Sequence, residues 1–186
     1  MALMTILGIA IGLGMDSLAV SLVAGSRQQR LSLRTLFRMA WHFGLFQCLM
    51  TVAGWYLGTG INRYISAYDH WVAFGLLALV GIKMIRESLS DGSGHMALND
   101  PTRGWTLIML SIATSIDAFA VGLSMAFLGV RIWMPCAVIG LVTVVMTTVG
   151  MICGKSLGAA FGKRMTLIGG LILIGIGVRI LFTHMA

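Results

Sequence analysis

Six long apolar segments constrain the fold of this 186-residue chain more than any other feature of its sequence. A transmembrane helix needs about 20 apolar residues to cross the roughly 30 Å hydrocarbon core of a bilayer. The segments have this length and run over residues 3–25, 36–60, 69–88, 104–128, 132–153 and 165–184. Only helices and closed barrels span lipid, and such continuous runs lack the alternation of barrel strands. The sequence therefore predicts an all-α membrane protein with six transmembrane helices.

The amino-acid composition favours lipid as the solvent and excludes a soluble enzyme. Hydrophobic residues make up 58% of the chain and charged residues only 10%, whereas soluble domains have about 25% charged residues. Six crossings use nearly the whole chain, so we expect neither a catalytic domain nor a resident cofactor. The cysteines Cys48, Cys136 and Cys153 lie in apolar segments without CxxC spacing, which predicts buried thiols instead of disulfides or a zinc site.

The basic residues give the chain a net charge of +7 and predict its orientation. In a soluble protein this charge would suggest nucleic acid as a partner, but here the expected partner is the lipid bilayer. Cytoplasmic loops of membrane proteins are enriched in Lys and Arg. We therefore expect the first, third and fifth connections in the cytoplasm and both termini outside. These connections and the helix ends beside them carry Arg27, Arg30, Arg34, Arg38, Lys83, Arg86, Arg103, Lys155, Lys163 and Arg164.

The two halves of the chain repeat one pattern in the same order. Residues 14–20 resemble residues 115–121 at an offset of 101, and five residues of the second segment recur in the fifth at an offset of 96. The five are Gly44, Met50, Thr51, Gly54 and Gly58, which recur as Gly140, Met146, Thr147, Gly150 and Gly154.

An odd number of spans in each copy makes the second copy enter the membrane from the opposite side. The pattern therefore predicts two inverted three-helix repeats, 1–88 and 104–186, joined by a cytoplasmic linker over 89–103. Inverted repeats recur in secondary transporters, where they support alternating access. Duplication retained only for packing is the alternative.

Asp16 and Asp117 occupy matching positions in the two repeats, each 13 residues after the start of its apolar segment. At 1.5 Å per residue each carboxylate lies roughly 20 Å into its helix, where an ionised Asp costs about 2.5–3.5 kcal/mol. Small neighbouring residues allow the two helices to approach. We expect the carboxylates to meet and bind a divalent cation such as Mn²⁺ or Mg²⁺, because hard ions prefer oxygen ligands. A protonated pair that only joins two helices is the alternative.

Further oxygen-bearing side chains lie near the two aspartates. Gln47, its repeat counterpart Thr143, and Thr114 beside Asp117 are candidate ligands, although Gln and Thr also bond neighbouring helices. Small residues allow close helix contact, so glycines are predicted at the helix-packing faces. These are Gly12, Gly54, Gly58, Gly150 and Gly154.

The whole chain resembles the MntP family of bacterial manganese efflux pumps. The resemblance rests on Gly14-Met15-Asp16, on the run from Ala113 to Gly122, on Asp69-His70-Trp71 and on the run from Gly169 to Val178. It implies a six-span protein of the bacterial inner membrane that exports Mn²⁺ as its substrate, with Asp16 and Asp117 essential. The chain has Ser17-Leu18 where the family tends to show Ala-Phe, and Gln47 where some relatives are acidic.

The main hypothesis is therefore a manganese exporter with protons as the candidate counter-ion. Three alternatives stay open. One is an exporter of another divalent metal or of a basic amino acid, because a fold does not specify its cargo. The second is an intramembrane aspartyl protease, since Gly12-Leu13-Gly14-Met15-Asp16 superficially resembles a protease motif and paired Asp can share a proton. The third is an assembly subunit that transports nothing.

Overall fold

All secondary structure in the described part of the chain is helical, which confirms the all-α prediction. The computed structural model describes residues 3–26, 28, 32–65, 69–89, 102 and 104–185. The helices are α1 (Leu3–Ser26), α2 (Leu33–Ile65), α3 (Asp69–Leu89), α4 (Gly104–Phe127) and α5 (Trp133–Met185). The bounds of α1, α3 and α4 lie within a residue or two of the predicted segments, whereas α2 extends beyond its segment at both ends.

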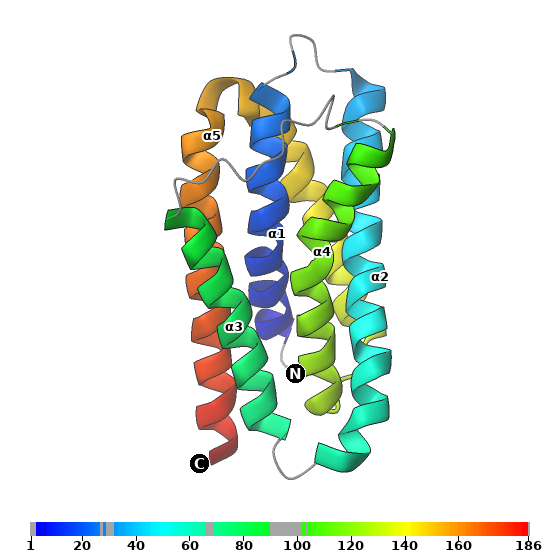
Figure 1. Cartoon of the computed structure of the whole chain (residues 1–186), viewed down its shortest axis with the longest axis vertical. Helices are drawn as coiled ribbons and strands as arrows, with labels where there is room; N and C mark the ends of the chain where they lie inside the picture. The colour runs from blue at the N-terminus through cyan, green and yellow to red at the C-terminus, as the bar shows by residue number, and fades with distance from the viewer. Residues whose placement is uncertain are drawn as a thin grey trace.

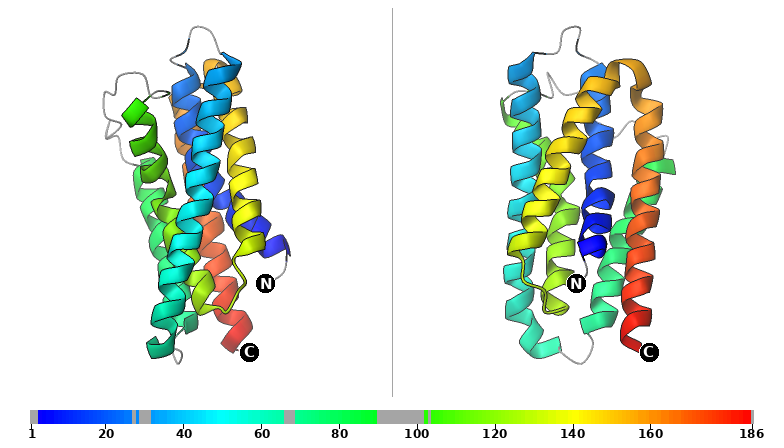
Figure 2. Two further views of the ribbon diagram at one scale, coloured as in Figure 1. Left: turned by 90° about the vertical axis from the view of Figure 1, so that its right-hand side faces the viewer. Right: turned by 180° about the vertical axis from the view of Figure 1, so that it is seen from behind.

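Helix α5 joins the two segments that the sequence predicts as separate helices over 132–153 and 165–184. Its helical conformation continues through the intervening residues, so the expectation of a non-helical connection there is wrong. No proline lies in this stretch, but it contains Ser156, Gly158 and Gly162, and glycine and serine are residues at which helices bend sharply. Figure 2 shows the ribbon of α5 rising in yellow, turning over at the top of the bundle and descending in orange and red.

Three stretches of the described residues are long and apolar enough to cross a membrane. They are Leu3–Ser26, Gly104–Phe127 and Trp133–Gly154, with mean hydropathies of 2.0, 1.8 and 2.3. The predicted second segment, within α2, is not among them, because the polar His42 and Gln47 interrupt its apolar run. These three helices place the chain among multi-pass membrane proteins by length and composition.

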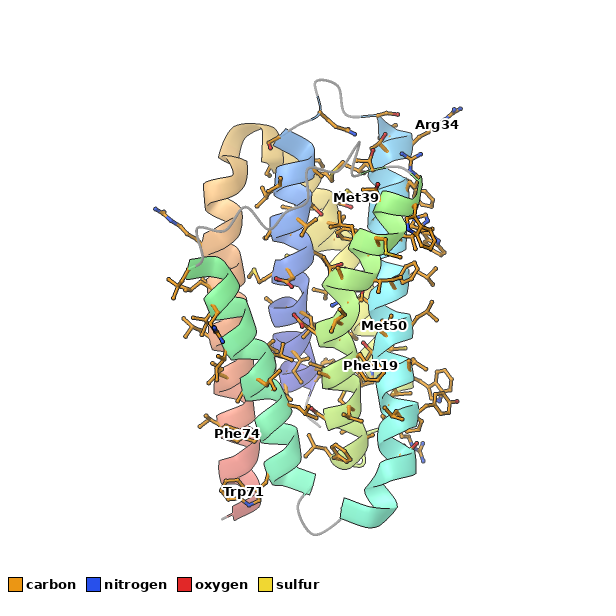
Figure 3. All side chains as sticks on the ribbon, in the orientation of Figure 1. Arg34, Met39, Met50, Trp71, Phe74 and Phe119 are labelled. Atoms are coloured by element: carbon orange, nitrogen blue, oxygen red, sulfur yellow. The ribbon has the colours of Figure 1, made fainter. Side chains whose placement is uncertain are left out.

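The helices form one elongated bundle (Figure 1). At the upper end of the bundle α1 ends, α2 and α4 begin, and α5 reverses its direction. Toward the lower end α1 begins and α5 ends. Figure 3 shows Arg34 projecting at the upper end and Trp71 near the lower end of α3. Large apolar side chains such as Leu141 and Trp105 are exposed on the outside, as expected of a surface that faces lipid.

Apolar side chains from several helices form the core. One cluster joins Leu13 of α1, Ala118 of α4 and Ile139 of α5. A second cluster includes Met39 of α2 and Leu107 of α4, and Figure 3 shows Met39 in the upper half of the bundle. The core therefore connects both halves of the sequence.

Two hydrogen bonds attach connecting residues to the bundle. Arg38 Nε on α2 donates to the Thr102 carbonyl oxygen at 2.7 Å, which holds the chain just before α4. Trp55 Nε1 on α2 donates to the Val130 carbonyl oxygen at 2.8 Å. This second contact follows Gly129, whose φ of +65° lets the chain turn from α4 toward α5.

Candidate functional site

The two predicted carboxylates lie on α1 and α4, each 13 residues after the first residue of its helix. Asp117 is buried, with 4% of its surface exposed, and Asp16 is half-buried. Both helices are membrane-length, so each carboxylate lies about 20 Å from its helix start at 1.5 Å per residue. That the two carboxylates meet stays a prediction.

Gln47 is fully buried and contacts the helix that carries Asp117. Its Oε1 accepts a hydrogen bond from Ser115 Oγ at 3.2 Å, and its carbonyl oxygen accepts one from Thr51 Oγ1 at 2.7 Å. The amide Nε2 of Gln47 has no hydrogen-bond partner within the described residues. The structure thus places Gln47 beside Ser115, two residues before Asp117 on α4. Sequence reasoning missed Ser115, although it occupies the repeat position of Gly14.

The two predicted threonines differ in how their hydroxyl groups are used. Thr114 lies within hydrogen-bond distance of two carbonyl oxygens of its own helix, Leu110 at 3.0 Å and Ser111 at 3.1 Å. Thr143 is fully buried, and its Oγ1 bonds to no other group in the part of the chain that the structure describes. Of the two, Thr143 therefore has the hydroxyl group that is available to a ligand.

Glycines allow α2 and α4 to pack backbone against backbone. A Cβ at Gly54 would overlap the Phe119 carbonyl oxygen, and a Cβ at Gly58 would lie 3.0 Å from the Leu123 carbonyl oxygen. Figure 3 shows Phe119 at mid-height, on the side where α2 and α4 lie next to each other. Such close approach requires small residues on the contact face.

The same arrangement occurs between α5 and α1. A Cβ at Gly150 would lie 2.8 Å from the Leu18 carbonyl oxygen, and a Cβ at Gly154 would overlap the Leu22 carbonyl oxygen. The glycines of α5 lie 96 residues after those of α2, and the contacted residues of α1 lie 101 residues before those of α4. These are the offsets of the sequence repeat. The contacts of Gly54 and Gly58 with α4 thus have counterparts between α5 and α1, whereas Gly122 of α4, whose Cβ would overlap the Thr51 carbonyl oxygen, corresponds to Ser21. Gly12, the remaining predicted packing glycine, is buried in α1.

Helices α2 and α5 cross where two counterpart glycines meet. A Cβ on Gly44 would lie 2.9 Å from the Gly140 carbonyl oxygen, and a Cβ on Gly140 would lie 3.2 Å from the Gly44 carbonyl oxygen. This crossing links the α1–α5 contact to the α2–α4 contact. The helices that carry Asp16 and Asp117 are therefore connected through a tightly packed centre.

The candidate ligands in this interior are carboxylate, amide and hydroxyl groups. No group of three or more His, Cys, Asp or Glu side chains gathers within the described ranges. The predicted ligands are two carboxylates with neutral amide and hydroxyl oxygens. Such ligands suit hard divalent ions better than soft ones.

Comparison with known proteins reveals the family of the chain. A family model described as "Putative manganese efflux pump" matches residues 30–181. The chain belongs to this family. The resemblance that the sequence motifs predict is thereby confirmed.

Relatives cover nearly the whole chain. A protein of Syntrophotalea carbinolica named "Putative manganese efflux pump MntP" is 52% identical over 184 residues, which cover 99% of this chain and 98% of that protein. A relative of the same name in Citrifermentans bemidjiense is 53% identical and covers 97% of this chain and 96% of its own length. One from Oleidesulfovibrio alaskensis is 48% identical, with 95% and 94% covered. No solved structure matches the chain.

Proposed function

We propose that the protein exports Mn²⁺ from the cytoplasm as a secondary transporter of the bacterial inner membrane and catalyses no reaction. The buried carboxyl group of Asp117 carries the proposal, because an ionised Asp at mid-membrane costs about 2.5–3.5 kcal/mol and is retained for a function. Asp16 occupies the matching position on α1. The name shared by the relatives supports Mn²⁺ as the cargo.

The proposed mechanism is alternating access by two inverted three-helix repeats. Their boundaries are 1–88 and 104–186, with 89–103 as the cytoplasmic linker. The paired glycine contacts support this arrangement, because a twofold relation converts the α2–α4 contact into the α5–α1 contact. Exchange of the two repeat conformations then exposes a central site first to one side and then to the other.

In this mechanism Asp16 and Asp117 bind the cation, and Gln47 and Thr143 add neutral oxygens. Two carboxylates match the charge of a divalent ion, so the loaded site is electrically balanced. Protons that neutralise the carboxylates after release would balance the return step, which makes proton exchange the proposed coupling. The aspartyl protease alternative has less support, since cleavage of a peptide requires no repeated packing.

The proposed orientation places both termini outside the cytoplasm. Arg34 and Arg38 lie in the first two turns of α2, and α2 begins at the upper end of the bundle in Figure 1. Under the positive-inside rule this end faces the cytoplasm. Helix α1 starts and α5 ends toward the opposite end, so in this orientation both termini lie outside the cytoplasm.

Substitution of the two aspartates tests the function directly. We expect Asp16→Asn and Asp117→Asn each to abolish Mn²⁺ tolerance in manganese-sensitive bacteria and Mn²⁺ flux in liposomes, while the protein still inserts. Asp69→Asn, at the first residue of α3, is the control and should retain both. Normal flux in both variants would refute the proposal.

Flux assays with other cargo separate the remaining candidates. Liposomes loaded with Mn²⁺, Mg²⁺ or arginine are compared with and without an imposed pH gradient. We expect Mn²⁺ to leave fastest and a proton gradient to accelerate its exit. Faster exit of Mg²⁺ or arginine would replace Mn²⁺ as the cargo, and an unchanged rate would remove protons from the cycle.

A further inference from the structure

Three fully buried hydroxyl groups lack hydrogen-bond partners among the residues that the structure describes. They belong to Ser17 of α1 and to Thr143 and Thr147 of α5, and each residue is 0% exposed. Other buried hydroxyls have partners: Ser111 Oγ donates to the Leu107 carbonyl oxygen of its own helix at 2.7 Å, and Ser115 Oγ donates to Gln47 Oε1 of α2 at 3.2 Å. A buried polar group without a partner destabilises a protein and requires an explanation.

Two glycine contacts define the register of α1 against α5. A Cβ on Gly14 would lie 3.1 Å from Met146 Cγ, and a Cβ on Gly150 would lie 2.8 Å from the Leu18 carbonyl oxygen. Residue numbers rise together along the two helices, so these segments run parallel. The α1 residues between the two contacts therefore lie level with the α5 residues between them.

Two of the unpartnered hydroxyls, those of Ser17 and Thr147, lie at this level. Ser17 falls between Gly14 and Leu18 on α1, and Thr147 directly follows Met146 on α5. Thr143 precedes Thr147 by four residues and shares its helix face. Asp16 is the residue before Ser17, so its carboxylate belongs to the same level of the bundle.

The other half of the molecule satisfies its corresponding groups. Gln47, the counterpart of Thr143, accepts a hydrogen bond from Ser115, and Thr51, the counterpart of Thr147, donates to the Gln47 carbonyl oxygen. The counterpart of Ser115 is Gly14, which has no side chain to offer Thr143. Available hydroxyl oxygens therefore concentrate on the α1–α5 side.

We infer that Ser17, Thr143 and Thr147 form, with Asp16, an oxygen-lined cation subsite on the α1–α5 side. A hydroxyl offers a neutral oxygen to a hard divalent cation, or accepts and donates hydrogen bonds to the water that the cation retains. The subsite binds Mn²⁺ together with part of its hydration shell. The α1–α5 side then offers more ligand oxygens to the cation than the α2–α4 side does. This inference rests on the proposed function for the identity of the cargo.

Replacement of the hydroxyls by methyl groups tests the subsite. Thr143→Val with Thr147→Val, and separately Ser17→Ala, are compared with wild type for KM and kcat of Mn²⁺ flux in liposomes. The second readout is the rise in melting temperature that Mn²⁺ produces, which measures binding to the folded state without transport. We expect KM to increase roughly tenfold for each hydroxyl removed, with a smaller change in kcat. The variants should melt at a higher temperature than wild type without Mn²⁺, and Mn²⁺ should raise that temperature less.

Thr148 serves as the matched control. Its hydroxyl donates to the Val144 carbonyl oxygen of its own helix at 2.8 Å. Thr148→Val should leave KM and the Mn²⁺-induced stabilisation unchanged. If the double variant does not insert, the single variants carry the same test.

An unchanged KM and unchanged Mn²⁺-induced stabilisation in all hydroxyl variants would overturn the subsite. The proposed function fails in a different way, because it requires loss of flux in Asp16→Asn and Asp117→Asn. Loss of flux in the aspartate variants with normal KM in the hydroxyl variants would remove only the subsite.

Discussion

Substitution of Gly54 by alanine should weaken the contact between α2 and α4 by a predictable amount. A Cβ at this position would overlap the Phe119 carbonyl oxygen, with the Phe119 carbonyl carbon at 2.9 Å and the Leu123 nitrogen at 3.1 Å. All three are backbone atoms of a helix, so no side chain can rotate away to relieve the overlap. The two helices must therefore separate, and they lose van der Waals contacts along the whole packing face.

The expected change in stability combines two opposing terms. Overpacking in a closely packed interior costs about 1–3 kcal/mol, and backbone overlap places Gly54→Ala near the upper value. Alanine in a helix is favoured over glycine by about 1 kcal/mol. The difference predicts a loss of about 2 kcal/mol, equivalent to a fall in melting temperature of about 4–8 °C for a protein of this size.

Gly60 on the same helix provides the matched control. It is exposed, and a Cβ there would meet no atom within 4 Å. Gly60→Ala should therefore keep or slightly raise the melting temperature measured on the purified protein in detergent. Gly150→Ala, with the Leu18 carbonyl oxygen at 2.8 Å, should give an intermediate loss. Equal melting temperatures for Gly54→Ala and Gly60→Ala would refute the reasoning.

Three further predictions concern contacts between helices. Trp55→Phe removes the donor to the Val130 carbonyl oxygen and should lower the free energy of unfolding by about 1 kcal/mol, whereas Trp133→Phe, at an exposed position, should leave it unchanged. Arg38→Met removes the donor to the Thr102 carbonyl oxygen and should lower the free energy of unfolding by about 1–2 kcal/mol. Arg34 is exposed and lies one turn earlier, so Arg34→Met should lower it less. The reverse order in denaturant unfolding would contradict this role of Arg38. Cys48 of α2 packs against the core cluster that contains Cys136 of α5, so an added two-electron oxidant such as diamide should join the two thiols, with loss of both thiol hydrogens to the oxidant. Mass spectrometry of peptides that instead finds Cys153 in the disulfide would contradict the α2–α5 packing.

The sequence predicts much of the helical architecture because lipid imposes a simple length and polarity rule. The ends of α1, α3 and α4 follow from where apolar residues begin and end. The close packing at Gly54 and Gly150 is consistent with the repeat, since small residues at a constant offset indicate a contact that both halves share. Asp117 stands out because a carboxylate is rare in such an apolar segment.

Other features depend on contacts between segments that are distant in sequence, which no local sequence pattern shows. The sequence does not predict the continuity of α5, because polar and basic residues after Gly154 indicate a loop, whereas the backbone there is helical. The bond between Ser115 and Gln47 depends on how α4 is rotated against α2. The unpartnered hydroxyls of Ser17 and Thr147 become visible only when neighbouring donors and acceptors have been placed.

The crossing of Gly44 and Gly140 has a consequence for how motion would be detected. These residues occupy the same position in the two copies of the pattern and lie against each other's backbone. In the proposed arrangement the twofold axis that relates the copies passes between them, and residues at this crossing move least when the two repeats rock about it. Spectroscopic labels next to this pair should report a constant separation throughout a working cycle, while labels far along the same helices, beyond Gly58 and Gly154, should swing through the largest change.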